Sequence, residues 1–318
     1  MLTNKKISIV VICYLDEPAV PIMYDRVKKI MSKITNNWEL IYVNDGSPDN
    51  AEEVLKKLAN EDKRVTVINH SRNFSSQNAF ISGMKQSLGD AVVLLDGDLQ
   101  DPPEMIEAFV EKWLEGNEVV YGIREKRETS SFMQIAYKFF YKIFQKLSYI
   151  KIPLDAGDFS LMDRKIVDAI IAMPERDIFL RGLRAWVGFK QTGIKYIRPE
   201  RMFGVTTNNL RNNIRWAKKG IFSFSYLPLE YIFYTGIAVV IFSFLAIVFY
   251  LFSYIFIWFP RGSSGIQTII ILILFLGGAQ LLAISIIGEY LAKIFEETKK
   301  RPKYIIKDIL NDHRKDQK

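Results

Sequence analysis

The sequence predicts an α/β domain with a mainly parallel central sheet, followed by a C-terminal hairpin of two transmembrane helices. In the N-terminal part, short apolar runs of the kind buried on both faces of a sheet alternate with amphipathic stretches, which is the pattern of βα units. Near the C-terminus, residues 231–259 and 265–288 contain no charged residue. Each of these two stretches exceeds the roughly 20 residues that cross a bilayer as a helix.

The strands are predicted from short apolar runs, of which 7–13 and 91–95 are the most continuous. These runs are 7–13, 38–43, 65–69, 91–95, 119–121 and 194–197. Helical periodicity follows most of them. An amphipathic helix is predicted after the loop 14–18, with apolar positions at Met23, Val27, Ile30 and Ile34, and further helices are predicted at 77–88, from Pro103 onward, at 163–173 and at 179–186. No G-x-G-x-x-G and no Walker loop occurs in the chain, which disfavours a dinucleotide-binding or P-loop fold.

Two aspartates separated by glycine follow the buried run 91–95. Asp96 and Asp98 stand at the predicted carboxyl end of a strand, which is where open α/β sheets bind ligands. Together with the amide oxygen of Gln100 they are hard oxygen ligands, suited to a Mg2+ or Mn2+ ion that also takes phosphate oxygens. We therefore predict a divalent metal that holds a diphosphate, the alternative being an acidic turn without a ligand.

Further candidates follow the other strands. Asp45, in the turn-forming segment 44–49, is predicted to accept hydrogen bonds from a base or a ribose, although the segment also fits a plain turn and helix cap. Arg72 is placed to meet a phosphate after the third strand. Arg124 and Arg127 carry guanidinium groups suited to a diphosphate or an acceptor phosphate, the alternative being a solvated charged surface.

Charge and composition favour a membrane surface as the partner of this chain. The net charge is +8, basic residues gather beside both apolar stretches, and no nucleic-acid-binding motif is present. By the positive-inside rule both termini are predicted to be cytoplasmic, with the short loop 260–264 outside. A single cysteine, Cys13, excludes an intrachain disulfide, and the two histidines, His70 and His313, argue against a zinc site built from histidine. No signal peptide is predicted at the N-terminus.

Two further stretches are basic and amphipathic. Residues 131–149 and 208–222 both fit helices that lie along a membrane interface, although packing of 131–149 against the sheet is an equal alternative. The predicted layout is therefore a cytoplasmic domain at 1–206, a juxtamembrane amphipathic helix at 207–227, the two spans within 228–290 and a basic cytoplasmic tail at 291–318.

The motifs, taken together and in this order, resemble the polyprenyl-phosphate glycosyltransferases, which are family 2 enzymes of the GT-A fold. Among them the arrangement with two spans is most similar to the bacterial bactoprenol glucosyltransferases, and dolichyl-phosphate mannose synthases are related. The segments that carry the resemblance are Tyr14-Leu15-Asp16-Glu17, Val43-Asn44-Asp45-Gly46-Ser47, Ser71-Arg72-Asn73-Phe74, Asp96-Gly97-Asp98-Leu99-Gln100-Asp101-Pro102-Pro103, Gly157-Asp158-Phe159 and the C-terminal hairpin.

The resemblance implies inverting transfer of a sugar, most simply glucose, from a UDP-sugar to a polyprenyl phosphate at the cytoplasmic face of the inner (plasma) membrane. It implies that Tyr14, Asp16, Asp45, Arg72 and Asp96 bind the nucleotide sugar, that Asp96, Asp98 and Gln100 hold the metal and diphosphate, and that Asp158 lies on the acceptor side. Asp98 and Asp158 are the predicted catalytic residues, and Arg124, Arg127 and Arg181 the predicted phosphate-binding residues.

Two departures from the family pattern bear on these roles. Leu15 stands where many relatives carry a polar residue, and the segment 201–208 matches the family's R-x-x-G-x-S-K-Y only loosely. Two other functions remain open as alternatives: a processive polysaccharide synthase, for which Asn212-Asn213-Ile214-Arg215-Trp216 is an imperfect Q-x-x-R-W, and a membrane scaffold without catalysis. A homo-oligomer is also left open.

Overall fold

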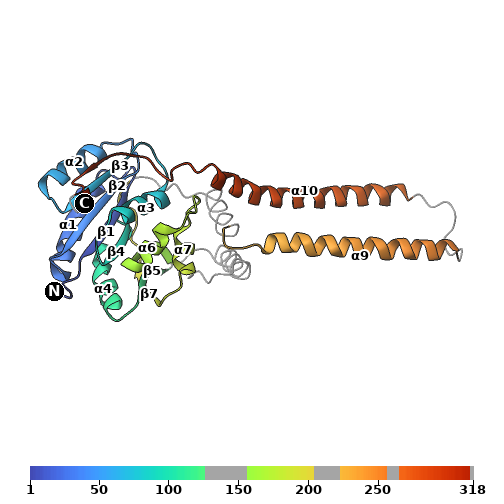
Figure 1. Cartoon of the computed structure of the whole chain (residues 1–318), viewed down its shortest axis with the longest axis horizontal. Helices are drawn as coiled ribbons and strands as arrows, with labels where there is room; N and C mark the ends of the chain where they lie inside the picture. Colours follow the sequence, from blue (N-terminus) through green and yellow to red (C-terminus); the bar gives the residue numbers. More distant parts are fainter. Residues whose placement is uncertain (126–155, 204–222, 256–264, 316–318) are drawn as a thin grey trace. The chain divides into compact units, whose positions relative to one another are not determined.

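A computed structural model describes residues 1–125, 156–203, 223–255 and 265–315 of the chain (Figure 1). These residues divide into two compact units. One unit contains the described residues up to 203 together with 301–315, and the other contains 223–255 and 265–300. The predicted amphipathic helices at 131–149 and 208–222, and Arg127, lie outside the described residues.

The first unit is built on an eight-stranded sheet with strand order β7-β5-β6-β4-β1-β2-β3-β8. The four central strands β1, β2, β3 and β4 are mutually parallel, and β5 pairs in parallel with β7, so the prediction of a mainly parallel sheet is confirmed. Strands β6 and β8 run antiparallel to their neighbours. The strands are β1 (Ile7–Cys13), β2 (Trp38–Asn44), β3 (Val65–His70), β4 (Ala91–Asp96), β5 (Val119–Glu125), β6 (Ala156–Asp163), β7 (Gln191–Ile197) and β8 (Ile306–Leu310).

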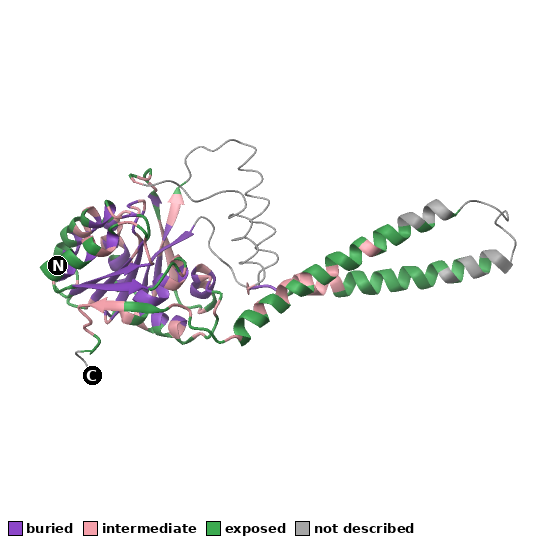
Figure 2. Ribbon diagram, turned by 90° about the horizontal axis from the view of Figure 1, so that it is seen from above, coloured by how far each residue is buried: buried purple, intermediate pink, exposed green. Residues whose placement is uncertain are grey.

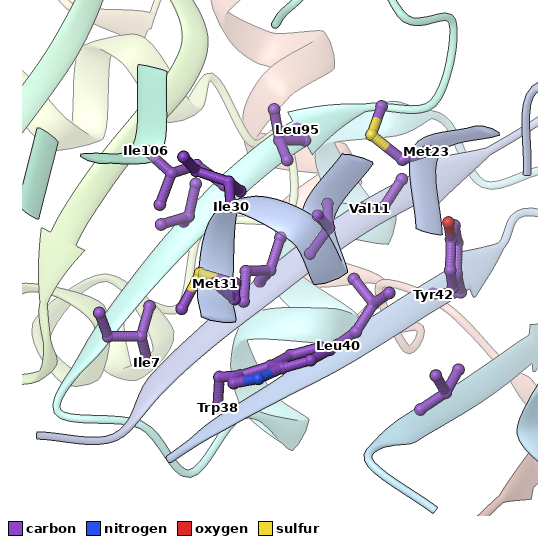
Figure 3. Packing of buried hydrophobic residues seen from close by; sticks show 14 of the residues in the cluster. Ile7, Val11, Met23, Ile30, Met31, Trp38, Leu40, Tyr42, Leu95 and Ile106 are labelled. Carbon is purple, nitrogen blue, oxygen red and sulfur yellow. The ribbon is translucent and has the colours of Figure 1, made fainter. Parts of the chain in front are cut away.

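Helices pack on the two faces of this sheet because its central strands are apolar on both sides. On one face, alternate residues of the central strands meet α1 (Ala19–Ile34), α2 (Ala51–Glu61) and α4 (Ile106–Leu114) in the main core. Figure 3 shows part of this core, where Met23 and Ile30 of α1 lie over Val11 and Leu40. Burial of these side chains is the main stabilising contribution to the fold.

The opposite face is covered by α3 (Ser76–Gln86), with α6 (Arg164–Ala172) and α7 (Leu180–Trp186) further along the sheet. Gly83 lets α3 approach closely, because a Cβ at this position would overlap the side chain of Val10 in β1. The 3-10 turn η1 (Pro103–Met105) precedes α4, so the helix predicted from Pro103 onward begins as a 3-10 turn.

The structure departs from the predicted elements in two places. The sequence of 155–161, with its central glycine, predicts a turn before a short strand. In the structure Asp158 is instead part of β6, which is buried along nearly its whole length between β4 and β5. Residues 306–310, predicted to lie in a basic tail, form β8 and pair with β3 at the edge of the sheet. The chain after the second long helix thus returns to the first unit.

The second unit contains two long apolar helices, α9 (Leu227–Ile255) and α10 (Ile266–Thr298). Both contain segments long and apolar enough to cross a membrane, Leu227–Ala246 and Leu272–Thr298, each with mean hydropathy 1.9. Figure 2 shows that their described residues are mostly exposed, in contrast to the buried sheet. Exposing an apolar surface of this extent to water is energetically unfavourable, so these helices fit a membrane-associated protein.

Candidate active site

A pocket of about 230 Å³ opens at the carboxyl ends of β1, β2 and β4. Parallel strands end at the same edge of the sheet, so the loops that follow them converge there. The pocket brings together four of the predicted aspartates, Asp16, Asp45, Asp96 and Asp98, with Tyr14 beside them. The other lining residues are Ile12, Cys13, Asn73, Ser76, Gly97 and Arg201.

Gly97 allows the turn between Asp96, the last residue of β4, and Asp98 to lie against β1. A Cβ at Gly97 would collide with the backbone carbonyl oxygen of Ile12, which cannot move away because it belongs to the sheet. The DGD segment therefore needs glycine at its centre for close packing, and its two carboxylates are positioned by a rigid strand end.

We predict that Gly97→Ala raises the KM for the substrate that binds in this pocket at least about tenfold and destabilises the protein by about 1–3 kcal/mol, because the loop must shift away from Ile12. Steady-state kinetics and thermal unfolding in detergent measure the two effects. Gly116→Ala is the matched control: it costs stability through a left-handed backbone, φ 89°, but has no neighbour within 4 Å and should leave the KM unchanged. An unchanged KM in Gly97→Ala would contradict this account of the loop.

Asp16 is held in the pocket by an arginine from a distant part of the chain. The Nη2 of Arg201 donates to Asp16 Oδ1 at 2.9 Å, and the Asp16 side chain is largely buried. Burial raises the pKa of Asp16, and the guanidinium group of Arg201 partly offsets this effect. The sequence places Arg201 at the start of the loose R-x-x-G-x-S-K-Y match but does not predict its pairing with Asp16, because residues so far apart in the chain leave no local pattern.

Asp45 is buried at the end of β2 and is fixed through one oxygen. Its Oδ1 accepts hydrogen bonds from the backbone N–H of Phe74, at 2.9 Å, and from Nδ1 of His70, at 2.8 Å. The adjacent Gly46 has φ 63°, and a Cβ there would overlap the backbone of Arg72. The loops after β2 and β3 therefore pack directly on each other.

Asp96 and Asp98 are part of a crowded acidic group that also includes the fully buried Asp101. Burial raises the pKa of Asp96, and the neighbouring carboxylates of Asp101 and Asp98 raise it further. Arg198, which the sequence analysis did not identify, lies beside this group, with its Nη2 3.7 Å from Asp98 Oδ2 and its Nε 4.0 Å from Asp101 Oδ1. Such a group favours cations.

Gln100 lies at the edge of this group, with its side chain turned elsewhere. Its Nε2 donates to the backbone carbonyl of Pro199 at 3.1 Å, and Gln100 is not among the residues that line the pocket. Within the part of the chain that the structure describes, no group of three or more His, Cys, Asp or Glu side chains is arranged to hold a metal ion. Of the three predicted metal ligands, Asp96 and Asp98 line this pocket and Gln100 does not.

Asp158 forms a second, mostly buried charged cluster with α7. Arg181 Nε donates to Asp158 Oδ1 at 3.2 Å, and Gln77 Nε2 donates to Asp158 Oδ2 at 2.9 Å. Burial alone would raise the pKa of Asp158, but the charges of Arg181 and Arg184 and the hydrogen bonds outweigh it, so this pKa lies below its usual range. Asp158 is therefore an ionised acceptor of hydrogen bonds at neutral pH.

Arg184 supports the same cluster from the next turn of α7. It is fully buried, its Nη2 donates to the backbone carbonyl of Gly157 at 3.2 Å, and its guanidinium lies 5.0 Å from the ring centroid of Tyr121. Burial lowers its pKa to about 10. Arg181 and Arg184 therefore concentrate positive charge around a single carboxylate.

The remaining predicted arginines occupy different surroundings. Arg124 donates from Nε to the hydroxyl of Tyr196 at 3.3 Å and lies 3.9 Å from Asp101, so it is part of the acidic group. Arg72 is exposed and does not line the pocket: it donates to the backbone carbonyl of Asn73 and stacks on the ring of Phe74 at 4.1 Å. Arg127 lies outside the described residues.

Comparison with known proteins places this geometry in a family. Residues 8–171 match the family model described as glycosyl transferase family 2. This chain belongs to that family. The chain is 41% identical over 301 residues to an uncharacterized glycosyltransferase, YkcC, of Bacillus subtilis (strain 168). This match covers 94% of this chain and 92% of the relative.

Other relatives carry a more specific name. The bactoprenol glucosyl transferase of Shigella phage SfX is 38% identical over 303 residues, covering 95% of this chain and 99% of the phage protein. The prophage bactoprenol glucosyl transferase homolog of Escherichia coli (strain K12) is 38% identical over 305 residues. This match covers 96% of this chain and 99% of the Escherichia coli protein. The predicted family is therefore confirmed. The first unit, with its central sheet, is the GT-A domain of this chain.

Proposed function

We propose that this protein transfers glucose from UDP-glucose to the phosphate of a polyprenyl phosphate, with inversion at the anomeric carbon. The single observation that supports this most strongly is the convergence of Asp16, Asp45, Asp96 and Asp98 in one pocket at the carboxyl edge of a family 2 sheet. Glucose and a polyprenyl acceptor are inferred from the names of relatives that cover nearly the full chain.

On the donor side, Asp45 and Asp16 are assigned to the nucleotide, with Tyr14 beside them. Both carboxylates are buried and fixed by hydrogen bonds, so little side-chain freedom is lost when a ligand binds. Arg201 lies against Asp16 and carries a guanidinium group suited to phosphate oxygens. We infer that Arg201 exchanges part of its contact with Asp16 for the diphosphate of the donor.

A divalent cation, Mg2+ or Mn2+, fits beside Asp96 and Asp98. Asp96 and Asp98 line the same pocket, and the neighbouring carboxylates of Asp101 and Asp98 raise the pKa of Asp96. A cation bound there would stabilise the ionised forms of Asp96 and Asp98. Mg2+ in particular binds through one or two carboxylates together with substrate phosphates. When bound, such an ion would neutralise the negative charge that develops on the departing diphosphate. Gln100 would need to leave the carbonyl of Pro199 to act as a ligand.

On the acceptor side, Arg181 is assigned to the phosphate of the lipid, and Asp158 orients Arg181. The second pKa of a phosphate monoester is about 6, so the acceptor phosphate is largely dianionic at neutral pH. It therefore needs no general base to attack. Asp158, whose pKa is lowered, orients groups through its ionised form rather than removing a proton. Arg124 is placed beside Asp101 and assists with the negative charge on the donor diphosphate.

The reaction then follows from charge and position. A phosphate oxygen of the acceptor attacks the anomeric carbon, a new C–O bond forms, and the bond to the UDP oxygen breaks with its electron pair passing to the diphosphate. Attack from the face opposite the leaving group inverts the configuration. The protein contributes orientation of both substrates and stabilisation of the charge on UDP.

The two apolar helices are proposed to cross the membrane, with the catalytic domain and both termini in the cytoplasm. Basic residues before α9 and after α10, against a single arginine in the connecting segment, favour this orientation. A lipid acceptor explains why a glycosyltransferase domain would be anchored in this way. We propose the plasma membrane as its location for the same reason.

The test uses purified full-length protein in detergent with undecaprenyl phosphate and a panel of UDP-glucose, UDP-galactose, UDP-N-acetylglucosamine and GDP-mannose. We expect release of UDP from UDP-glucose that requires both the lipid phosphate and Mg2+ or Mn2+, and that EDTA reduces at least about a hundredfold. Acceptor-independent release, or full release in EDTA, would contradict the proposal. A preference for another donor would reject glucose and retain the transferase.

A further inference from the structure

The C-terminal segment 301–315 is built into the edge of the sheet next to the nucleotide subsite. Strand β8 pairs antiparallel with β3, and the pairing ends with His70 opposite Ile306. Just beyond, the backbone N–H of Ser71 donates to the carbonyl of Ile305 at 3.0 Å. The segment therefore follows β3 to its carboxyl end, where the loop that carries Phe74 begins.

A line of side-chain hydrogen bonds connects β8 to the loop after β2. Asn69 Nδ2 donates to Asp308 Oδ1 at 2.8 Å, and Asn44 Nδ2 donates to Asn69 Oδ1 at 3.0 Å. The Oδ1 of Asn44 in turn accepts from the backbone N–H of Ser47 at 3.0 Å. Both asparagines are buried, so their polar groups depend on these partners. Asp308 thus supports the segment that contains Asp45.

A second connection runs through aromatic rings. The ring of Tyr304 stacks on that of His70, with centroids 5.2 Å apart and planes 13° from parallel, while Phe74 meets His70 edge-on at 5.8 Å. His70 Nδ1 hydrogen-bonds Asp45 Oδ1 at 2.8 Å, and since a carboxylate only accepts, Nδ1 is assigned the proton. Two independent connections from the C-terminal segment therefore converge on the same aspartate loop.

The orientation of the His70 ring depends on this stacking. The ring is fully buried, and among the described residues its Nε2 has no hydrogen-bond partner. The imidazole turns about its Cβ–Cγ bond, and any such turn would move Nδ1 away from Asp45. The stacked ring of Tyr304 and the edge contact with Phe74 restrict this rotation. The hydrogen bonds that the described residues make to Asp45 go to Oδ1, which leaves Oδ2 as the oxygen for a ligand in the pocket.

We propose that Tyr304 is a positioning residue for nucleotide binding: stacked on His70, it holds the imidazole that orients Asp45. The C-terminal segment then acts as a support of the donor subsite, contributed by the part of the chain that follows α10. This inference rests on the proposed function, because it takes Asp45 to contact the nucleotide.

The experiment measures UDP affinity in the presence of Mn2+ by isothermal titration calorimetry, using full-length protein in detergent, together with donor and acceptor kinetics. Tyr304→Ala is expected to weaken UDP binding about tenfold and to raise the KM for UDP-glucose, with kcat and the KM for undecaprenyl phosphate unchanged. Tyr304→Phe keeps the ring and should bind UDP like the wild type. Lys307 lies on the same C-terminal segment and forms an ion pair with Glu52 of α2. Lys307→Ala removes this ion pair and is the matched control, for which we expect unchanged UDP affinity.

A double-mutant cycle with His70→Asn tests whether Tyr304 acts through His70. The asparagine amide can replace the Nδ1–H donor but offers no ring, so adding Tyr304→Ala should then cause no further loss of UDP affinity. If Tyr304→Ala does not unfold cooperatively, Tyr304→Leu, which keeps apolar volume, takes its place.

The outcomes separate the two proposals. Wild-type protein that binds no UDP would reject the proposed function and this inference with it. Wild-type affinity in folded Tyr304→Ala or Tyr304→Leu, or an equal loss of UDP affinity with and without His70, would overturn only the role of Tyr304.

Discussion

Asp98→Asn is expected to reduce glucosyl transfer about a hundred- to a thousandfold while leaving the fold intact. The substitution removes one of the two carboxylates proposed to hold the cation and adds an amide of similar shape. Asp98 Oδ1 accepts a hydrogen bond from the backbone N–H of Gln100 at 3.1 Å, which an asparagine oxygen can also accept. Arg198 lies 3.7 Å from Asp98, so little stability depends on the charge of Asp98. The measurement is the rate of UDP release at saturating donor and acceptor, with thermal unfolding recorded in parallel.

The control for this variant is Glu104→Gln, which removes an acidic group from the same connection but outside the pocket. Glu104 is paired with Arg26, and its side chain is 54% exposed. Exposed pairs of this kind contribute at most about 1 kcal/mol, so activity should be retained. Wild-type turnover in Asp98→Asn would remove Asp98 from the catalytic residues.

Asp158→Ala is expected to cause the largest loss of stability, about 3 kcal/mol in the free energy of unfolding. Without Asp158, Arg181 loses its carboxylate partner and the buried Arg184 loses the neighbouring negative charge. The value lies at the lower end of the range for broken buried pairs because the Arg181 side chain remains 34% exposed. Urea-induced unfolding in detergent, followed by tryptophan fluorescence, measures it.

The pH dependence of this contribution has a definite sign. The pKa of Asp158 is lowered in the folded protein, so the unfolded state binds the proton more tightly. The stabilisation is therefore fully present above the pKa of Asp158 in the unfolded chain, about 3.9. It is lost as the pH falls through the lowered pKa of the folded protein. Asp168→Ala, which breaks an exposed pair with Arg164 on α6, should change stability by less than about 0.5 kcal/mol. Equal stability of both variants at pH 7 would contradict this account.

The central strands were predictable because burial on both faces leaves a local signal. The runs at 7–13, 38–43, 65–69 and 91–95 are mostly apolar, and each forms a parallel strand with closely matching bounds. β6 was only partly predicted, since Ala156 and Gly157 are typical of a turn, whereas strand pairing on both sides decides their conformation. β8 was not predicted, because its short, partly charged sequence gains strand structure only from the edge of β3.

The site divides in the same way. Aspartates that directly follow strands, such as Asp45 and Asp96, were predictable because parallel topology brings strand ends together. The contacts of Arg198 and Arg201, and the stack of Tyr304 on His70, join residues far apart in the sequence and depend on the tertiary structure. For Gln100 the residue type suggested a ligand, whereas its amide binds the carbonyl of Pro199.

Mass spectrometry of the lipid product tests the central claim most directly. Full-length protein is incubated with undecaprenyl phosphate, UDP-glucose and Mg2+, and the lipid fraction is analysed. The account predicts a single new species, the lipid phosphate plus one hexose, that is absent with Asp98→Asn. A ladder of longer products would indicate a processive synthase, and an unmodified lipid would contradict glucose transfer from UDP-glucose to polyprenyl phosphate.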